Sequence, residues 1–252
     1  MRRIRTAAIL FVGFAQAGLW GCAATQVALS KKDLDVQTKM SETVFLDPVS
    51  QDKMSIYVKV RNTSDKSNFD IEGPIQAAMQ AKGYTVTSSP DAAHYTLLAN
   101  VLSVEKSSPT AAEAALHNGY GGPILAGAVG GALVGHAAGG GMGAAYGAGA
   151  GGLAAAGAEV IAGSLVKDVT YVVITDIELR EKVRSGVVVR QDQRQDAKQG
   201  IGGARSQRSS EVTDYKSYRT RVVSTANKVN LAYEEAAPAL TAGLTRSLAG
   251  LF

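Results

Sequence analysis

The sequence predicts an α+β protein: a small mixed α/β sandwich domain that is interrupted by a glycine-rich helical membrane hairpin. Three observations give this prediction. Alternating strand patterns and an amphipathic helix pattern precede residue 119, a long uncharged glycine-rich run follows, and β-branched stretches with a second helix pattern complete the chain. The expected divisions are a signal peptide at 1–21, a lipid-anchored segment at 22–53, the first half of the domain at 54–118, the hairpin at 119–163, and the second half with a C-terminal helix at 164–252.

The N-terminus, MRRIRTAAILFVGFAQAGLWGCAAT, has the organisation of an export signal. Arginines precede an apolar stretch, and small residues follow where a peptidase would cleave. The segment 19–22 resembles the lipobox of bacterial lipoproteins, although Trp20 stands where a small residue is usual. The Cys22 thiol would carry the lipid; the alternatives are an ordinary secretory signal or a short buried helix. Ala23 follows, where aspartate would signal inner-membrane retention, so the expected location is the outer membrane.

Composition narrows the function classes. The formal charge of the 252-residue chain is +4, but Arg2, Arg3 and Arg5 lie in the expected signal peptide. Without them 23 basic residues face 22 acidic ones, so the charge gives no support to a nucleic-acid partner. Cys22 is the single cysteine, which excludes a disulfide within the chain. Hydrophobic residues make up 46% and aromatic residues only 6%, so we expect a core of modest size.

The first half of the expected domain reads as strand, helix, strand, strand. Residues 54–60 alternate as a half-buried strand does. Asp70 is placed to cap a helix that ends at Gly83, since glycine commonly follows a helix terminus. Strands follow at 84–86 and at 94–104. The buried stripe expected for the helix consists of Ile71, Ile75, Ala78 and Met79.

The second half begins with a long β-branched strand at 169–179 and a shorter partner at 185–190. The polar stretch 191–214, with three glycines near its middle, is expected to form a long mobile loop. Residues 218–231 look like a half-buried strand, and 234–252 like an amphipathic helix. Its leucines, at intervals of four, are expected to pack on the sheet rather than contact a membrane: Leu240, Leu244 and Leu248.

The glycine-rich run is the most unusual feature of the sequence. Between Glu113 and Glu159 there is no charged side chain, a length sufficient for two membrane spans of about 20 residues. Glycines at every fourth position would form one close-packing ridge, and Gly139, Gly140 and Gly141 would form the turn of a helical hairpin. A buried or oligomerising helical pair and a flexible linker are the alternatives. The ridge consists of Gly127, Gly131, Gly135, Gly139, Gly143, Gly147 and Gly151.

Catalytic chemistry is not predicted. His94 lies in an expected strand, His117 in a linker and His136 in the apolar run, where it is the one ionisable group. Their positions have no metal-ligand spacing, and no nucleophile-elbow motif occurs. We therefore expect no enzyme, no catalytic residue, no metal site and no cofactor beyond the covalent lipid on Cys22.

Several co-linear blocks resemble the TraT lipoproteins of conjugative plasmids and their chromosomal relatives. The blocks cover nearly the whole mature chain: QTKMSETVFLDP at 37–48, NTSDK at 62–66, AKGYTV at 81–86 followed by SSPDAAHY, ANVL at 99–102, VKDVTYVVITDIELRE at 166–181, and YRTRVVSTANKVNLAYEEAAPAL at 218–240. The resemblance implies a surface-exposed outer-membrane lipoprotein that forms large homo-oligomers. It also implies surface exclusion in conjugation and resistance to complement, neither of which is an enzymatic reaction.

The leading hypothesis is therefore a non-enzymatic homo-oligomeric ring in the outer membrane. Its expected partners are further copies of itself, outer-membrane lipid, and the donor-cell pilus or outer-membrane mating proteins. The alternative is a subunit of an outer-membrane transport or secretion pore, and an envelope hydrolase is a third candidate. The sequence departs from the family at 104–119, within the glycine-rich run and at 191–214, which are candidate determinants of exclusion specificity.

Overall fold

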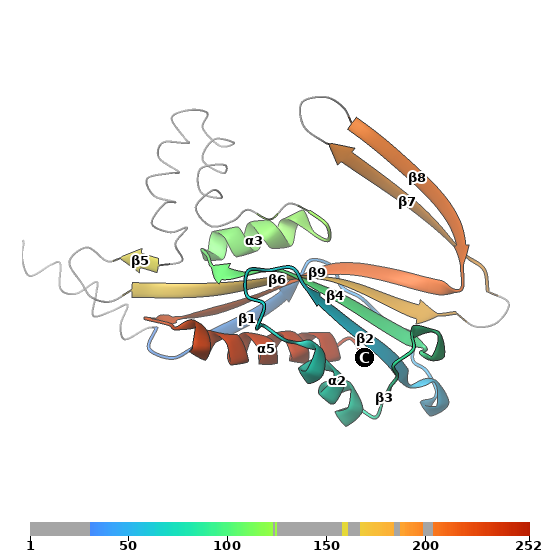
Figure 1. Cartoon of the computed structure of the whole chain (residues 1–252), viewed down its shortest axis with the longest axis horizontal. Coiled ribbons are helices and arrows are strands. Elements are labelled where there is room, and N and C mark those ends of the chain that lie inside the picture. Colours follow the sequence, from blue (N-terminus) through green and yellow to red (C-terminus); the bar gives the residue numbers. More distant parts are fainter. Residues whose placement is uncertain (1–30, 123, 125–157, 161–166, 184–186, 199–203) are drawn as a thin grey trace, which may run out of the picture.

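The computed structural model describes residues 31–122, 124, 158–160, 167–183, 187–198 and 204–252. One seven-stranded sheet forms the middle layer, with helices on both of its faces (Figure 1). Its strand order is β1-β9-β6-β4-β2-β3, and β5 pairs separately with β6. A two-stranded ribbon, β7–β8, projects from one end of the sheet. The strands are β1 (Asp35–Met40), β2 (Ser55–Asn62), β3 (Thr85–Val86), β4 (Tyr95–Lys106), β5 (Ala158–Val160), β6 (Lys167–Lys182), β7 (Val189–Lys198), β8 (Ala204–Thr213) and β9 (Tyr215–Val229).

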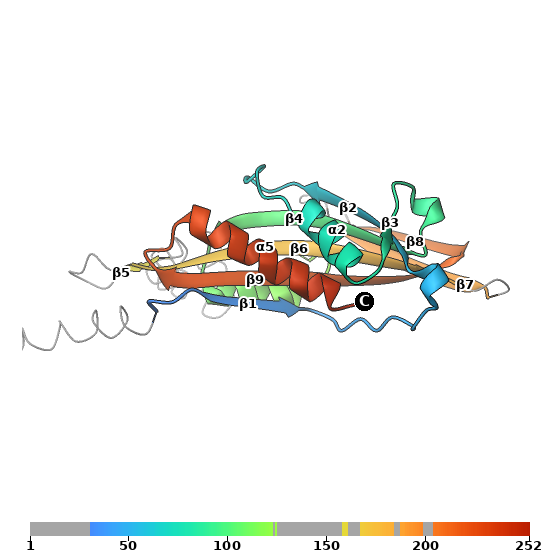
Figure 2. The same ribbon diagram turned by 90° about the horizontal axis from the view of Figure 1, so that it is seen from below.

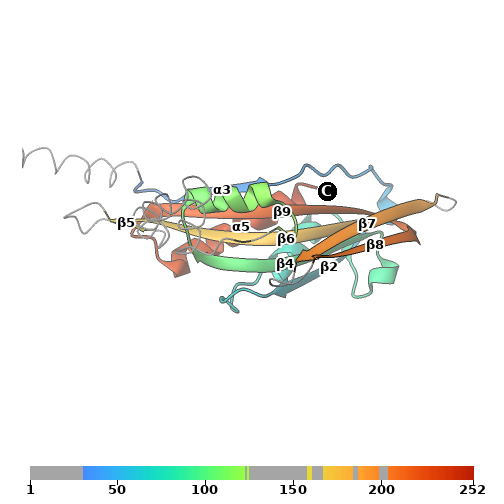
Figure 3. The same cartoon turned by 90° about the horizontal axis from the view of Figure 1, so that it is seen from above.

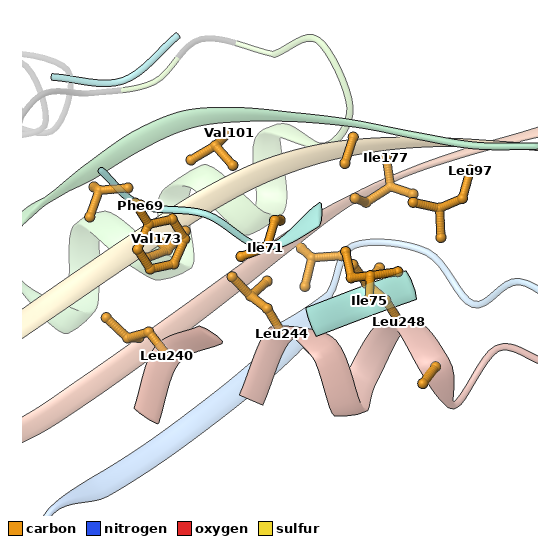
Figure 4. Close-up of a cluster of buried hydrophobic side chains, with 14 of the residues drawn as sticks. Phe69, Ile71, Ile75, Leu97, Val101, Val173, Ile177, Leu240, Leu244 and Leu248 are labelled. Carbon is orange, nitrogen blue, oxygen red and sulfur yellow. The ribbon is translucent and has the colours of Figure 1, made fainter. Parts of the chain in front are cut away.

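The lower face of the sheet is covered by α2 (Glu72–Ala81) and α5 (Tyr233–Ala249), as seen from below in Figure 2. The three leucines of α5 recur every four residues, so they form one stripe along the helix. All three are completely buried against strand residues such as Val173 and Ile177 (Figure 4). The prediction that this helix packs on the sheet is confirmed.

Gly243 shows how closely α5 approaches the strands beneath it. A Cβ atom at this position would lie 2.9 Å from the Thr38 hydroxyl oxygen and 3.2 Å from a methyl carbon of Val36. Glycine costs about 1 kcal/mol of helix propensity relative to alanine, and the close approach to β1 explains its presence in mid-helix. Thr38 and Ser224 join β1 to β9 here through a hydroxyl–hydroxyl hydrogen bond of 2.8 Å.

The upper face is covered along part of its length by α3 (Pro109–Asn118), which Figure 3 shows from above. The residue pattern of β6 changes where α3 stops covering the sheet. From Val169 to Ile174 nearly every residue is apolar, because α5 lies on one side and α3 on the other. From Thr175 onward apolar residues alternate with charged ones, since α3 no longer covers the upper face.

The predicted fold class is wrong. The described protein is mostly sheet, with helices laid on a single seven-stranded sheet, and not a small sandwich interrupted by a helical membrane hairpin. At the described ends of the expected hairpin the chain forms a corner at 119–122 and the strand β5, which pairs with β6. Among the described residues no helix is both long and apolar enough to cross a membrane. The remainder of that segment, 125–157, lies outside the described residues.

Three further elements differ from expectation. Strand β1 was not predicted, because its alternation involves only Val36, Thr38 and Met40 and charged residues interrupt it. Helix α3 replaces the expected linker: the Ser108 hydroxyl accepts a hydrogen bond from the Ala111 amide, and Pro109 occupies the first turn. The expected loop at 191–214 is instead the β7–β8 ribbon, with register Val189↔Thr213 to Lys198↔Ala204.

Seven other predicted elements are confirmed as β2, α2, β3, β4, β6, β9 and α5. The strand predicted at 185–190 differs, because among its described residues strand structure begins only at Val189, in β7. Helix α2 begins where Asp70 accepts a hydrogen bond from the Glu72 amide, and it is followed by Gly83 with a φ of 90°. Its buried residues, Ile75 and Met79, belong to the predicted stripe.

Candidate functional site

The residues that the sequence singled out for lipidation and helix packing lie outside the described part of the chain. Cys22 precedes residue 31, and the glycine ridge from Gly127 to Gly151, with the turn glycines 139–141 and His136, falls within 125–157. Of the three histidines, His94 directly precedes β4 and His117 lies in the last turn of α3.

The structure brings together a different set of residues, beginning with a buried ion pair on the upper face. Arg221 of β9 is fully buried and lies directly opposite Asp176 of β6 in the strand register. The guanidinium donates to both carboxylate oxygens, from Nε to Oδ1 at 2.7 Å and from Nη2 to Oδ2 at 3.0 Å. This two-pronged geometry is the strongest form of an arginine–carboxylate contact.

The same pair holds the chain where it leaves α3. Arg221 donates to the carbonyls of Ala115 and Gly122, at 3.3 and 2.9 Å, and Asp176 Oδ2 accepts from the Gly121 amide at 2.8 Å. We call Gly119–Gly122 with Asp176 and Arg221 the anchor corner. Each charge has several partners here, which offsets the large desolvation penalty of burying it.

The anchor corner requires glycine. Gly119 and Gly121 have φ values of 64° and 69°, in the left-handed region that side chains disfavour. A Cβ atom on Gly122 would lie 2.2 Å from the carbonyl oxygen of Asn118. The glycines and the contacts with Asp176 and Arg221 therefore hold the point at which the chain continues into the glycine-rich segment.

Beyond α3 the upper face is polar, and we call this region the open face: Lys59, Arg61, Asn100, Glu178, Arg180 and Arg219. Glu178 lies between two arginines, with Arg180 Nε at 2.7 Å and Arg219 Nε at 3.1 Å. The Arg219 guanidinium also stacks over the Tyr120 ring, 5.4 Å from its centroid. A hollow of about 560 Å³ runs along this face beside the anchor corner.

A larger pocket of about 630 Å³ lies at the end of the sheet from which the ribbon extends. We call it the end pocket. Glu181 is buried in it, and the pKa of its carboxyl is raised mainly by this burial. Lys216 lies 3.9 Å from Glu181 and 2.6 Å from Asp47, while the Tyr218 hydroxyl donates to Glu181 at 3.3 Å. These contacts join the extended segment before β2 to β6 and β9.

His94 also lines the end pocket, together with Lys53 and Lys182. Burial lowers the pKa of His94, and the positive charges of the two lysines lower it further. Its ring packs edge-on against Tyr95 with centroids 4.7 Å apart, and its Nε2 is buried without a hydrogen-bond partner among the described residues. The end pocket thus combines a buried carboxylate with a group of cations, an arrangement suited to binding a charged molecule.

Sequence reasoning missed the anchor corner and the open face for one reason. Asp176 and Glu178 stand inside a β-branched run, and Arg219 and Arg221 inside another; each charge alone reads as a solvated strand face. Their significance depends on the register that places the two strands side by side. The described residues contain no group of three or more His, Cys, Asp or Glu side chains arranged to hold a metal ion.

Comparison with known proteins gives one consistent family. A family model described as TraT, the enterobacterial TraT complement resistance protein, matches residues 33–252. A TraT complement resistance protein of Escherichia coli is 42% identical over 233 residues, 92% of this chain and 92% of that protein. Another from Escherichia coli strain K12 is 40% identical over 233 residues, covering 92% of each. One from Wigglesworthia glossinidia brevipalpis is 26% identical over 246 residues, 97% of this chain and 95% of that protein.

Proposed function

The chain belongs to the TraT family of complement resistance proteins, and from this premise we propose that it is a non-enzymatic outer-membrane lipoprotein that protects the cell surface from complement. The observation that carries the proposal is the extent of the match, which runs from residue 33 to residue 252 and so includes the whole sheet, the anchor corner and the end pocket. A lipid on Cys22 would attach the protein to the membrane, and several acyl chains on one residue make a firm anchor.

The protein would act as a homo-oligomeric ring, and the ribbon supports this part of the proposal. In the described part of the chain, β7 and β8 pair only with each other. A two-stranded hairpin that stands alone is at best marginally stable in water. The ribbon nevertheless continues the β6–β9 ladder, because the Val183 amide donates to the Asp214 carbonyl at 2.8 Å. A second copy of the chain packed against the ribbon would supply the missing support.

Surface exclusion is the second activity in this proposal. The ring would reduce mating with donors that carry a related plasmid, and its contacts would be the donor-cell pilus or outer-membrane mating proteins. The ribbon extends away from the body of the protein (Figure 1), so it is accessible to such a partner. Its sequence also departs from the blocks that resemble the family, which suits a determinant of specificity.

Serum survival tests the principal function. A serum-sensitive strain that expresses the chain should survive active serum better than the same strain with an empty vector, and both should survive heat-inactivated serum equally. The variant Cys22→Ala should lose the protection although the protein is still made, because it lacks the lipid attachment. Equal killing of the expressing and empty-vector strains, at matched protein levels in the membrane, would contradict complement resistance for this chain.

Two further measurements test the oligomeric ring and surface exclusion. Replacement of residues 189–213 by an Asn-Gly turn should convert a large detergent-stable particle into smaller species while the far-UV circular dichroism of the sheet persists. A wild-type chain that is strictly monomeric in mild detergent would exclude the ring.

In mating assays, recipients that express the chain should yield fewer transconjugants from donors with a related plasmid than from donors with an unrelated one.

A further inference from the structure

Two of the lysines that line the end pocket, Lys53 and Lys182, are not paired with a carboxylate within the described part of the chain. Of the cations that line the pocket, Lys216 is paired with Asp47 and lies near Glu181. Within the residues that the structure describes, neither Lys53 nor Lys182 forms an ion pair. Both are close enough to His94 to lower the pKa of its imidazole. The protein therefore gathers positive charge around His94 in a concave site, where mutual repulsion is unfavourable unless an anion is present.

Three apolar side chains also line the end pocket: Val49, Val183 and Val187. The volume of about 630 Å³ lies in the range of small-molecule sites and exceeds what a single inorganic ion fills. A ligand that suits this lining has a compact organic part and a strongly anionic group.

We propose that the end pocket binds a phosphorylated organic molecule whose phosphate group lies between Lys53 and Lys182. A phosphate monoester carries nearly two negative charges at neutral pH and offers three acceptor oxygens, so it can engage both ammonium groups at once. A carboxylate carries one charge and would leave part of the positive field uncompensated. The organic part would occupy the remainder of the end pocket.

The structure explains why the negative side chains already present do not fill this role. Glu181 is buried, with its carboxylate committed to Tyr218 and facing Lys216, and Asp47 is bound to Lys216 at 2.6 Å. Among the described residues, the Lys182 ammonium group donates one long hydrogen bond of 3.5 Å, to the Asp91 carbonyl, which carries no formal charge. Within the end pocket, Lys216 is thus neutralised by carboxylates, whereas Lys53 and Lys182 form no ion pair among the described residues. The inference concerns a ligand of the sheet end and does not depend on complement resistance.

Equilibrium dialysis with radiolabelled glucose 6-phosphate, on the full chain in a neutral detergent, tests the proposal directly. We expect saturable binding of one molecule per chain, with competition by excess inorganic phosphate and none by glucose. The variant Lys53→Gln/Lys182→Gln should bind at least about tenfold more weakly, because each charge-assisted hydrogen bond that is lost is worth that factor or more. Both lysines are exposed, so the substitutions leave the core intact.

A matched control separates the site from general charge. The variant Lys32→Gln/Lys39→Gln removes the same charge from exposed positions at and before β1, away from the end pocket, and should bind normally. Absence of saturable binding by the wild-type chain, or an equal loss in the two double variants, would overturn the proposal.

Micelles doped with phosphatidic acid then distinguish two sources of the phosphate group. Displacement of glucose 6-phosphate assigns the site to a lipid headgroup, and its retention assigns it to a soluble phosphate ester.

Discussion

The two faces of the sheet are built for different tasks. The lower face is largely apolar, and α5 and α2 cover most of it with residues such as Leu240, Leu244 and Ile75. The upper face is apolar only beneath α3, and beyond that helix it carries the anchor corner and the charged open face. Strands β4, β6 and β9 contribute residues to both faces. The contrast teaches that one face supplies the stability of the fold, while the other positions the segments that leave it.

Removal of the arginine of the anchor corner should cause the largest loss of stability. Arg221→Ala leaves the Asp176 carboxylate buried without its partner, together with the carbonyls of Ala115 and Gly122. We expect the free energy of unfolding to fall by about 3–5 kcal/mol, the usual effect of breaking a buried pair. Urea unfolding followed by circular dichroism measures it.

A double variant distinguishes anchoring from stability. Arg221→Met combined with Asp176→Leu removes both charges, and such replacements are often neutral or stabilising. The Gly121 amide would still lose its acceptor, so hydrogen exchange at the corner should rise although global stability recovers. If both variants were equally unstable, the pair would not be acting as two compensating charges.

The lower face gives the second largest effect. Leu244→Ala should cost about 3 kcal/mol, within the range for a fully buried leucine, because the rigid sheet and α2 cannot close the cavity. Thermal or urea unfolding of the full chain checks this. The corner should keep its protection from hydrogen exchange, since α5 does not contact it; a loss of protection there would show that the two faces are coupled.

The open face should contribute much less. Arg180 is 45% exposed in its side chain and pairs with Glu178, which Arg219 also contacts. Arg180→Gln is expected to change the free energy of unfolding by no more than about 1 kcal/mol, because exposed ion pairs are screened and flexible. Urea midpoints at low and high salt measure this, and a change as large as that of Arg221→Ala would contradict the division of the upper face.

The smallest effect is a pH dependence at the end pocket. The pKa of His94 lies below 6.5 in the folded chain through burial, Lys53 and Lys182, so the unfolded chain takes up this proton first as pH falls. The stability attributable to His94 is full above pH 6.5 and decreases as pH falls from 6.5 to the lower folded pKa. His94→Gln should flatten the dependence of the unfolding midpoint on pH across that window.

Prediction from sequence succeeded where local pattern and burial coincide. Strands β2, β4, β6 and β9 alternate or are β-branched, and α2 and α5 carry apolar stripes between recognisable termini. It failed where the burial pattern was weak. Strand β1 and the ribbon are largely polar, and α3 packs on the sheet through alanines, so their periodicity was not visible. The uncharged glycine-rich run was assigned to a membrane hairpin from its length, its lack of charge and its glycine spacing, and the strand β5 at its described end contradicts that assignment.

The sequence by itself determined the family, the expected lipidation at Cys22 and the elements whose side chains repeat with the period of a helix or strand. Only the tertiary structure decided which polar residues form sites. Asp176 and Arg221 are 45 residues apart, and His94 is far along the chain from Lys182. Strand register and helix placement bring such groups together, because a buried charge requires a partner across the sheet and a local sequence pattern carries no information about that partner.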